Sequence, residues 1–192
     1  MDAPPMTPDA VQAAPVVVIG GAPGSGKSSI GKLLARSTGA ALLDQDTVTN
    51  PLIAQIAALT GAGDDLDHLS LRGEVRTARY ACLRDTAAEI SALGCPVVVV
   101  APFTAELLDL VAWQRFSVTL DRVVLVAVTI DPAESLRRRM LRGLARDRAL
   151  TGTPVESVAS APGRHVDLVL DGARPMEALV AEIRSSAGLP GR

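Results

Sequence analysis

Five short runs of apolar, mostly β-branched residues recur along this chain and constrain its fold more than any other feature. The runs are continuous rather than alternating, which is typical of strands covered on both faces of a sheet. They lie at Pro15–Gly20, Ala40–Asp44, Pro96–Ala101, Arg122–Ile130 and His165–Leu170. Helical patterns separate the runs. The sequence therefore predicts an α/β fold, a three-layer α/β/α sandwich around a five-stranded parallel sheet.

The segments between the runs carry signals for the beginnings and ends of helices. Asp131, Pro132 and Glu134 follow the order of a capping residue, a proline in the first turn and an acid near the positive end of a helix. Pro175 predicts the start of a last helix that ends near Ala187. Glycines stand where helices are expected to end, at Gly39, Gly61 and Gly94.

Length and composition exclude several classes of protein. A chain of 192 residues predicts one domain, residues 15–192, after a mobile arm at residues 1–14 that is rich in Pro and Ala. One Trp, one Tyr, two Phe and a net charge of −2 argue against a nucleic-acid or membrane surface. No run reaches the roughly 20 residues of a membrane span, and the N-terminus lacks the pattern of a secretory signal. We expect a cytoplasmic protein with no nucleic-acid or membrane partner.

The two cysteines, Cys82 and Cys95, show no metal-binding spacing. Because free cysteines are usually buried, we expect two reduced thiols that are at least partly buried.

The first apolar run leads directly into a glycine-rich loop. Residues 21–28 read GAPGSGKS and match G-x-x-x-x-G-K-[ST] at every fixed position, and a helical pattern follows. Glycines let successive backbone N–H groups turn toward an anion, and the helix N-terminus adds the positive end of its dipole. We expect Lys27 to contact the β- and γ-phosphates of ATP and Ser28 to ligate Mg²⁺. The candidate nucleotide-binding residues are Gly21, Ala22, Pro23, Gly24, Ser25, Gly26, Lys27, Ser28 and Ser29; the alternative is a fortuitous Gly-rich turn.

Two carboxylates end the second apolar run, at Asp44 and Asp46. In an extended strand, residues two apart point the same way, and the C-terminal end of this strand is expected beside the glycine-rich loop. One carboxylate can hold Mg²⁺ through water, and the other can accept a proton from an attacking hydroxyl. Alternatively, one of them only caps the following helix, for which Asn50-Pro51 is another candidate start.

GAPGSGKSS followed by LLDQDTVTNPL resembles the small P-loop kinases, the group that contains shikimate kinase, gluconate kinase and chloramphenicol phosphotransferase. The similarity extends from Pro15 to Ala187 and is greatest to uncharacterised bacterial AAA-family ATP-binding proteins. The resemblance implies a sheet ordered 2-3-1-4-5, a lid, and transfer of a phosphoryl group from ATP to a small hydroxyl compound. In this group the first second-strand Asp supports Mg²⁺ and the second contacts the accepting hydroxyl, roles that would fall on Asp44 and Asp46.

One position departs from the usual nucleotide-hydrolase pattern. The third run is followed by Ala101-Pro102-Phe103, without the acid that holds a metal in motor ATPases and GTPases. Adenine rather than guanine is expected from the resemblance, since no N-K-x-D segment is present.

A cluster of arginines precedes and enters the segment 142–164, which we expect to be the lid, with an ordinary surface loop as the alternative. In a helix Arg138 and Arg142 share a face, as do Arg142 and Arg146 if the helix continues. Guanidinium groups suit phosphate oxygens and developing transition-state charge. Arg142 and Arg146 are the catalytic candidates and Arg138 a nucleotide-binding candidate, although a solvated basic face would account for at least half of the six: Arg137, Arg138, Arg139, Arg142, Arg146 and Arg148.

A second set of arginines lies on a helix expected from about His68 to Leu93. Its predicted apolar face is Leu71, Val75, Ala78 and Cys82, and Arg72, Arg76 and Arg79 lie along the edge of that face. Such an edge would suit an anionic acceptor, with ordinary salt bridges as the alternative. The candidate substrate residues are Asp46, Arg72, Arg76 and Phe103, and Phe103 is equally consistent with a place in the core.

Taken together, the sequence favours an ATP- and Mg²⁺-dependent kinase that phosphorylates a small hydroxyl compound. A non-catalytic ATP-binding regulator and a simple NTP hydrolase remain alternatives. The acceptor and the oligomeric state are open at this point.

Overall fold

The computed structural model describes residues 12–61, 73–142 and 162–191. Five strands form one parallel sheet in the order β2-β3-β1-β4-β5, which confirms the order 2-3-1-4-5. The strands are β1 (Val16–Gly21), β2 (Ala41–Asp44), β3 (Val97–Val100), β4 (Val123–Thr129) and β5 (Leu168–Asp171).

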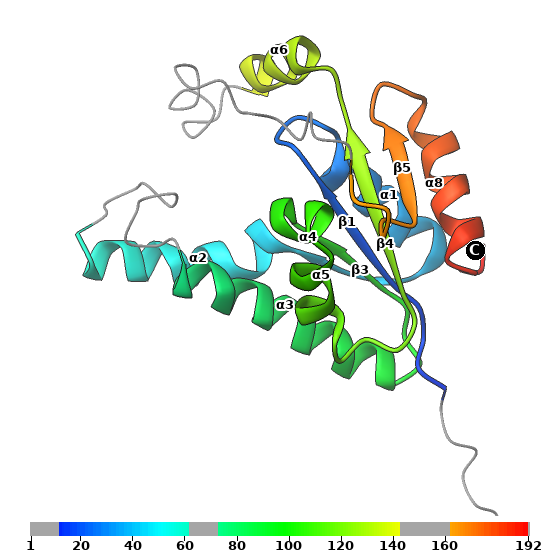
Figure 1. Cartoon of the computed structure of the whole chain (residues 1–192), viewed down its shortest axis with the longest axis horizontal. Coiled ribbons are helices and arrows are strands. Elements are labelled where there is room, and N and C mark those ends of the chain that lie inside the picture. Colours follow the sequence, from blue (N-terminus) through cyan, green and yellow to red (C-terminus); the bar gives the residue numbers. More distant parts are fainter. Residues whose placement is uncertain (1–11, 62–72, 143–161, 192) are drawn as a thin grey trace, which may run out of the picture.

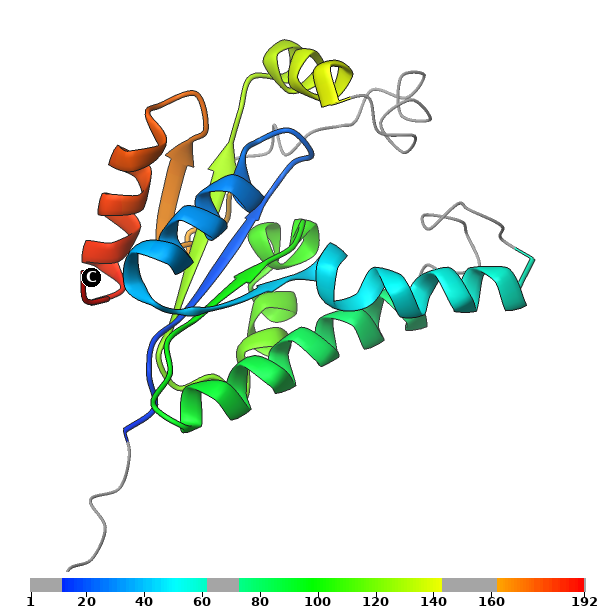
Figure 2. The same cartoon turned by 180° about the vertical axis from the view of Figure 1, so that it is seen from behind.

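Helices cover both faces of the sheet, so the three-layer prediction is also confirmed. In Figures 1 and 2, α1 and α8 cover one face, and α3, α4 and α5 cover the other. α2 and α3 run side by side and project beyond the sheet in both views. The helices are α1 (Lys27–Thr38), α2 (Gln45–Leu59), α3 (Glu74–Ala92), α4 (Thr104–Leu108), α5 (Leu110–Ser117), α6 (Pro132–Arg142) and α8 (Met176–Ser186).

The central strand β1 is buried on both faces, as its continuous apolar run predicts. Val17 and Ile19 pack in the core beneath α1 and α8, whereas Val16 and Val18 pack in the core beneath α3 and α5. Full burial of a Val or Ile side chain stabilises a fold by roughly 1.5–3 kcal/mol. The strand that leads into the glycine-rich loop is therefore held rigidly from both sides.

The predicted helix ends are largely confirmed. α1 ends at Gly39, which has a left-handed φ of 75°. Asp131 caps α6, because its Oδ1 accepts hydrogen bonds from the N–H groups of Ala133 and Glu134 at 2.9 and 3.2 Å. Pro175 directly precedes α8.

The predicted apolar face of α3 is wrong at Ala78 and Cys82, while Val75 is partly buried against Ile53 and Ala57 of α2, and Leu71 lies outside the described residues. The buried residues of this helix are Tyr80, Leu83, Ala87 and Ser91. Ala78 and Cys82 are exposed, because the larger Tyr80 and Leu83 side chains bury more apolar area and turn that side of the helix to the core. The expected burial of Cys82 is wrong for the same reason, while Cys95 is partly buried, and both thiols are free.

The end of the expected N-terminal arm is bonded to the domain. Ala14 is buried; its N–H donates to the carbonyl oxygen of Ser91, and the Ser91 hydroxyl donates to that of Ala14 at 2.6 Å. Arg122 donates to the carbonyl oxygen of Ala13. Residues 1–11 lie outside the described part of the chain. Among the described residues, no helix is long and apolar enough to cross a membrane.

Candidate functional site

The glycine-rich loop joins the C-terminal end of β1 to the N-terminus of α1. Gly24 and Gly26 have φ values of 85° and 95°, a conformation that favours glycine. Gly26 is the residue that caps α1 and brings no side chain, so the first turn of the helix presents its backbone N–H groups toward the loop. This arrangement is a ready-made anion site.

Two polar side chains of the loop lie against its own backbone. The Lys27 ammonium donates to the carbonyl oxygen of Ala22 at 3.2 Å, so the lysine folds back over the loop. Ser25 is fully buried, and its hydroxyl oxygen has no hydrogen-bond partner among the described residues. Ser28 is partly buried on the first turn of α1, and Ser29 is exposed.

α6 packs directly against this loop. The Ser135 hydroxyl donates to the carbonyl oxygen of Pro23 at 2.7 Å. A Cβ on Gly24 would come within 2.9 Å of the Ser135 carbonyl oxygen, so a larger residue would force α6 away from the loop. Glycine at position 24 is thus needed both for its backbone conformation and for this close packing.

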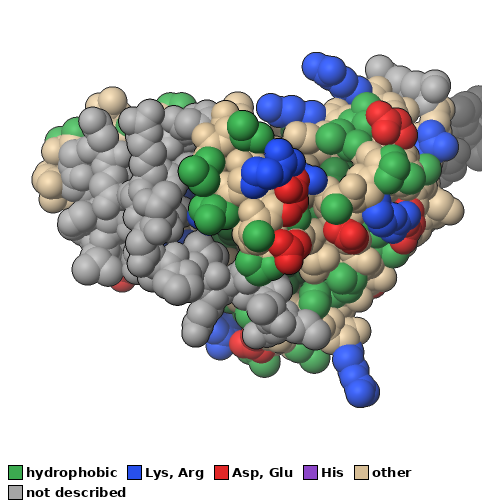
Figure 3. Space-filling view, turned by 90° about the horizontal axis from the view of Figure 1, so that it is seen from above, with side chains coloured by type: hydrophobic (Ala, Val, Ile, Leu, Met, Phe, Trp, Pro, Cys, Tyr) green, Lys and Arg blue, Asp and Glu red, His purple; other side chains and the backbone are tan. Residues whose placement is uncertain are grey.

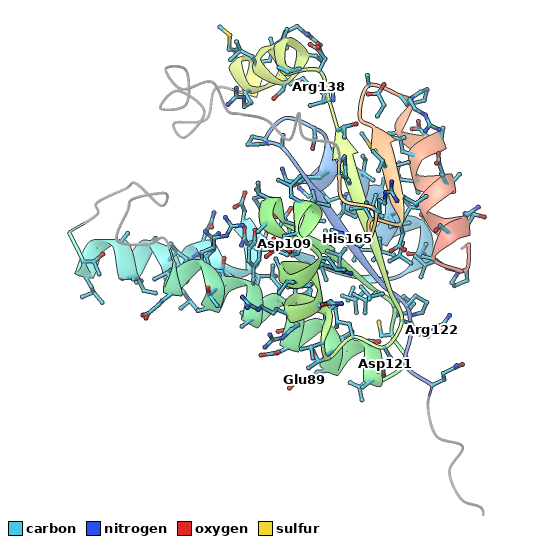
Figure 4. The ribbon with its side chains drawn as sticks, viewed as in Figure 1. Glu89, Asp109, Asp121, Arg122, Arg138 and His165 are labelled. Atoms are coloured by element: carbon cyan, nitrogen blue, oxygen red, sulfur yellow. The ribbon has the colours of Figure 1, made fainter. Side chains whose placement is uncertain are left out.

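Arg138 links α6 to the segment between β5 and α8. Its Nη1 donates to the carbonyl oxygen of Gly172 at 3.1 Å and would lie 3.8 Å from a Cβ on Gly26 (Figure 4). Its Nε donates to Glu134 at 2.7 Å. Arg137 also bonds Glu134, and the two arginines hold the pKa of the Glu134 carboxyl at about 2, well below its ordinary value of 4.5. The structure therefore brings Arg138 beside the glycine-rich loop, as expected for a nucleotide-binding residue.

Arg139, one of the six arginines but not one of the selected candidates, is the most buried arginine on α6 in the described structure. It is only 7% exposed, and its Nε and Nη1 have no hydrogen-bond partner among the described residues. Arg139 follows Ser135 by one helical turn, so the two share the face of α6 that touches the loop. Leaving a buried guanidinium unpaired is costly, and a phosphate group is a suitable partner for it.

On α6 the two signs of charge are mixed. Figure 3, which looks down on the molecule from above, shows basic and acidic side chains next to one another rather than in separate fields. The pairing of Glu134 with Arg137 and Arg138 is one physical basis of this mixture. We infer that individual arginines, rather than a broad positive field, would select a phosphate ligand here.

The structure separates the roles of Asp44 and Asp46. The prediction that both point the same way along a strand is wrong, because the chain turns into α2 at Gln45. Asp44 is the N-cap of α2: its Oδ1 accepts a hydrogen bond from the Asp46 N–H at 3.0 Å, and the residue is only 9% exposed. Asp46 lies in the first turn of α2 with its side chain 46% exposed.

The α3 arginines differ in how firmly they are held. Arg79 donates to Thr49 Oγ1 at 2.8 Å and to Asn50 Oδ1 at 2.7 Å, and it lies 3.9 Å from Asp46 Oδ1. Arg79 therefore ties α3 to the helix that carries Asp46. Arg76 has a half-exposed side chain, which lies over the Tyr80 ring at 4.9 Å.

Phe103 belongs to the core and not to an exposed wall of the acceptor site. It is fully buried, stacks on Tyr80 with ring centroids 5.1 Å apart, and meets Phe116 edge-on at 4.9 Å. Its φ of 47° is unusual for a residue other than glycine, and its N–H donates to the Tyr80 hydroxyl. The substrate-binding role suggested for Phe103 is therefore replaced by a structural one.

Glu106 was not among the candidate residues predicted from the sequence. It lies on α4, is 8% exposed, and its Oε2 has no hydrogen-bond partner among the described residues. Arg76 Nη2 lies 4.0 Å from that oxygen. Burial raises the pKa of the Glu106 carboxyl, and the nearby Arg76 only partly offsets this. A carboxyl at a short helix beyond a strand has no distinctive sequence pattern, so no signal in the chain identifies it.

Several predicted residues cannot be placed. Arg72, Arg146 and most of the expected lid lie outside the described residues, and Arg142 is described only as the last backbone position of α6. In the described ranges, no three His, Cys, Asp or Glu side chains gather to hold a metal ion. Mg²⁺ bound to a nucleotide usually takes only one or two protein ligands, so this finding leaves Ser28 and Asp44 as its candidates.

Comparison with known proteins agrees with this geometry. The sequence profile of a family described as AAA domain matches residues 16–160. The chain belongs to this AAA domain family. No curated protein matches the chain in sequence.

Solved structures of small kinases share the fold of this AAA-family protein. A sugar kinase from a Janibacter species is 18% identical, with a TM-score of 0.65 over 92% of this chain and 95% of the other. A shikimate kinase from Bacteroides thetaiotaomicron is 17% identical, with a TM-score of 0.62 over 91% and 98%. A gluconokinase from Sinorhizobium meliloti is 20% identical, with a TM-score of 0.59 over 92% of each chain. The fold is thus that of the small P-loop kinase group which the sequence resembles.

Proposed function

We propose that this protein is an ATP-dependent kinase that transfers the γ-phosphoryl group to a hydroxyl of a small molecule. The observation that carries the proposal is the meeting of three parts at one edge of the sheet. The glycine-rich loop follows β1, Asp46 follows β2, and the arginine-bearing face of α6 packs on the loop. The kinase names of the structural neighbours agree with the proposal.

The loop fits the phosphates of a nucleoside triphosphate. Its glycine conformations and the first turn of α1, which no side chain caps, favour an anion within its curve. Lys27 would exchange its bond to the Ala22 carbonyl oxygen for contacts to the β- and γ-phosphates. Arg138 and Arg139 would approach the phosphates from α6, and Arg139 would gain partners for the Nε and Nη1 atoms that have none among the described residues.

Ser28 and Asp44 would hold Mg²⁺, Ser28 through its hydroxyl and Asp44 through the oxygen that does not cap α2. Bound there, Mg²⁺ would neutralise charge on the phosphates. Both residues lie at the ends of elements that the packed sheet fixes, so little reorganisation is needed.

Asp46 would orient the accepting hydroxyl and take its proton. Its half-exposed carboxylate stands in the first turn of α2. Arg79, 3.9 Å away and bonded to Thr49 and Asn50, would hold that carboxylate in place. Catalysis of this kind depends on positioning and charge, and needs no covalent enzyme intermediate.

The test is ADP release from Mg·ATP with and without a panel of hydroxyl compounds. A rate that rises with an acceptor, together with a phosphorylated product identified by mass spectrometry, would establish the kinase. ATP binding with no turnover for any compound would favour a regulator. A substantial rate without an acceptor would favour a hydrolase.

A further inference from the structure

Glu106 and Arg76 form an unusual pair at the end of the sheet where the proposed acceptor would bind. α4, which carries Glu106, begins just beyond β3, and β3 pairs with β2 so that Val100 lies opposite Asp44. The Gly21 N–H donates to the Pro102 carbonyl oxygen, so the same segment is bonded to the start of the glycine-rich loop. Glu106 is therefore on the edge of the sheet that also carries Lys27 and Asp46.

The Glu106 carboxyl is supported by a hydrogen bond from its own backbone N–H, but one of its oxygens has no partner among the described residues. Its Oε2 is buried and has no hydrogen bond within the described part of the chain. Arg76 Nη2, at 4.0 Å, is too far away for a hydrogen bond and makes only a weak ion pair with it. Native proteins rarely leave a buried polar oxygen unsatisfied, and the exceptions are often functional.

Arg76 is oriented beside this carboxylate. Its Nη2 donates to the Tyr80 hydroxyl at 3.1 Å, and Tyr80 is itself fixed by the Phe103 N–H and by stacking on Phe103. The Arg76 side chain is 45% exposed, whereas that of Arg79 is only 15% exposed and already donates hydrogen bonds to Thr49 and Asn50 on α2. Arg76 thus offers solvent-facing N–H donors next to an unsatisfied carboxylate oxygen.

We infer that Glu106 and Arg76 together recognise a neutral polyol, Glu106 accepting a hydrogen bond from one hydroxyl and Arg76 donating to the neighbouring hydroxyl. This inference rests on the proposed kinase function and names the substrate class for its acceptor site. Adjacent hydroxyls match the pair because each hydroxyl both donates and accepts. A carboxylate on Arg76 would instead lie beside the like charge of Glu106, which disfavours the anionic acceptor expected from the sequence.

The experiment compares acceptors that differ mainly in one carboxylate. Binding is measured by titration calorimetry with the full chain saturated with Mg·ADP, using glucitol against gluconate, methyl shikimate against shikimate, and myo-inositol as a further neutral polyol. We expect at least one neutral compound to bind, and to bind more tightly than its acid counterpart. Transfer from Mg·ATP to the same compounds is measured in parallel.

The variant is Glu106→Gln, which keeps the shape but weakens the acceptor of the hydrogen bond. Loss of a charged hydrogen bond should raise Kd and KM for the neutral polyol by about tenfold or more, with a smaller effect on kcat. Glu89→Gln is the matched control, because Glu89 is an exposed acid at the far end of α3 (Figure 4). Unchanged ATP binding and Tm would show that the variant is folded.

Each outcome decides a different question. If no neutral compound binds, if the acids bind more tightly, or if Glu106→Gln binds polyols as the parent does, the inference is overturned. Phosphorylation of an acid compound alone would overturn the inference while supporting the kinase. Glu106-dependent polyol binding without any transfer would support the inference and overturn the kinase function. If Glu106→Gln does not fold, the comparison of neutral and acid compounds on the parent protein still tests the inference.

Discussion

The proposed nucleotide end and the proposed acceptor end of this molecule are built in different ways. At the nucleotide end, a loop of contiguous residues lies between a fully buried strand and a helix, and backbone groups supply much of the chemistry. At the acceptor end, Asp46, Arg76 and Glu106 come from three different helices, and side chains supply the chemistry. The first arrangement is fixed by local backbone conformation, and the second by how separate helices pack.

This difference indicates which residues can be substituted without loss of the fold. Gly24 and Gly26 cannot change without backbone strain, because both have positive φ. Arg76 is half-exposed, so its replacement would change recognition more than stability, whereas Glu106 is only 8% exposed, so a replacement there has to keep its shape. We expect substitutions at the nucleotide end to abolish turnover with every acceptor, and those at the acceptor end to be selective.

The largest effect is expected for Lys27→Ala, which removes the point charge opposite the phosphates. Loss of one such electrostatic contact should lower kcat by about 10²–10³-fold with all acceptors. The matched control is Lys32→Ala, which removes the only other lysine, an exposed residue on α1. Steady-state ADP release measures both. Equal turnover and equal ATP affinity in parent and Lys27→Ala would remove the loop from the mechanism.

A large effect confined to transfer is expected for Asp46→Asn. Removal of the proton acceptor should reduce kcat by about 10²-fold or more, the lower range of general-base effects. ATP affinity should be retained, because Asp46 is assigned to the acceptor. Asp121→Asn, at the opposite end of the sheet in Figure 4, is the control. Equal losses of ATP affinity and kcat would instead assign Asp46 to the nucleotide end.

The strand, loop and helix of the proposed nucleotide end were predicted from the sequence almost completely, and the structure at the proposed acceptor end only in part. The strand, the loop and the start of α1 are adjacent in the chain, so their pattern is visible without knowing the fold. The role of Asp44 was harder to predict, because whether this residue continues a strand or caps a helix depends on where α2 begins. In the structure α2 begins at Gln45, well before Pro51.

Glu106 and Arg139 could not be selected from the sequence, since their importance arises from burial. An acid on α4 and the last of three successive arginines look like ordinary surface residues until packing removes them from water. The misplaced apolar face of α3 has a related cause. Small residues such as Ala78 and Cys82 fit a helical period, but the bulky Tyr80 and Leu83 decided which side was buried.

A moderate effect is expected for Arg139→Met, which keeps much of the apolar stem and removes the guanidinium. Loss of charged contacts to phosphate should weaken ATP binding by about tenfold or more. Stability should be unchanged or higher, because this removes a buried charge whose Nε and Nη1 have no hydrogen-bond partner among the described residues. Arg137→Met is the control on the same helix, since Arg137 is exposed and pairs only with Glu134 in the described structure. ATP affinity and Tm are measured together, and a fall in Tm with unchanged affinity would give Arg139 a purely structural role.

The smallest effect concerns Glu134, whose contacts to Arg137 and Arg138 lower its pKa to about 2 from an ordinary 4.5. A carboxyl whose pKa is lowered in the folded state contributes stability. This stability is fully present above the pKa of the unfolded state and is lost as the pH falls toward the pKa of the folded state. Glu134→Gln should therefore lower Tm by a constant amount above about pH 5, and the difference from the parent should shrink between pH 4.5 and 2. Molar salt should weaken the difference at neutral pH, because solvent reaches this network. A Tm difference that stays constant down to pH 3 would mean that the arginines do not stabilise the Glu134 charge, and that Arg138 is held at the loop by Gly172 alone.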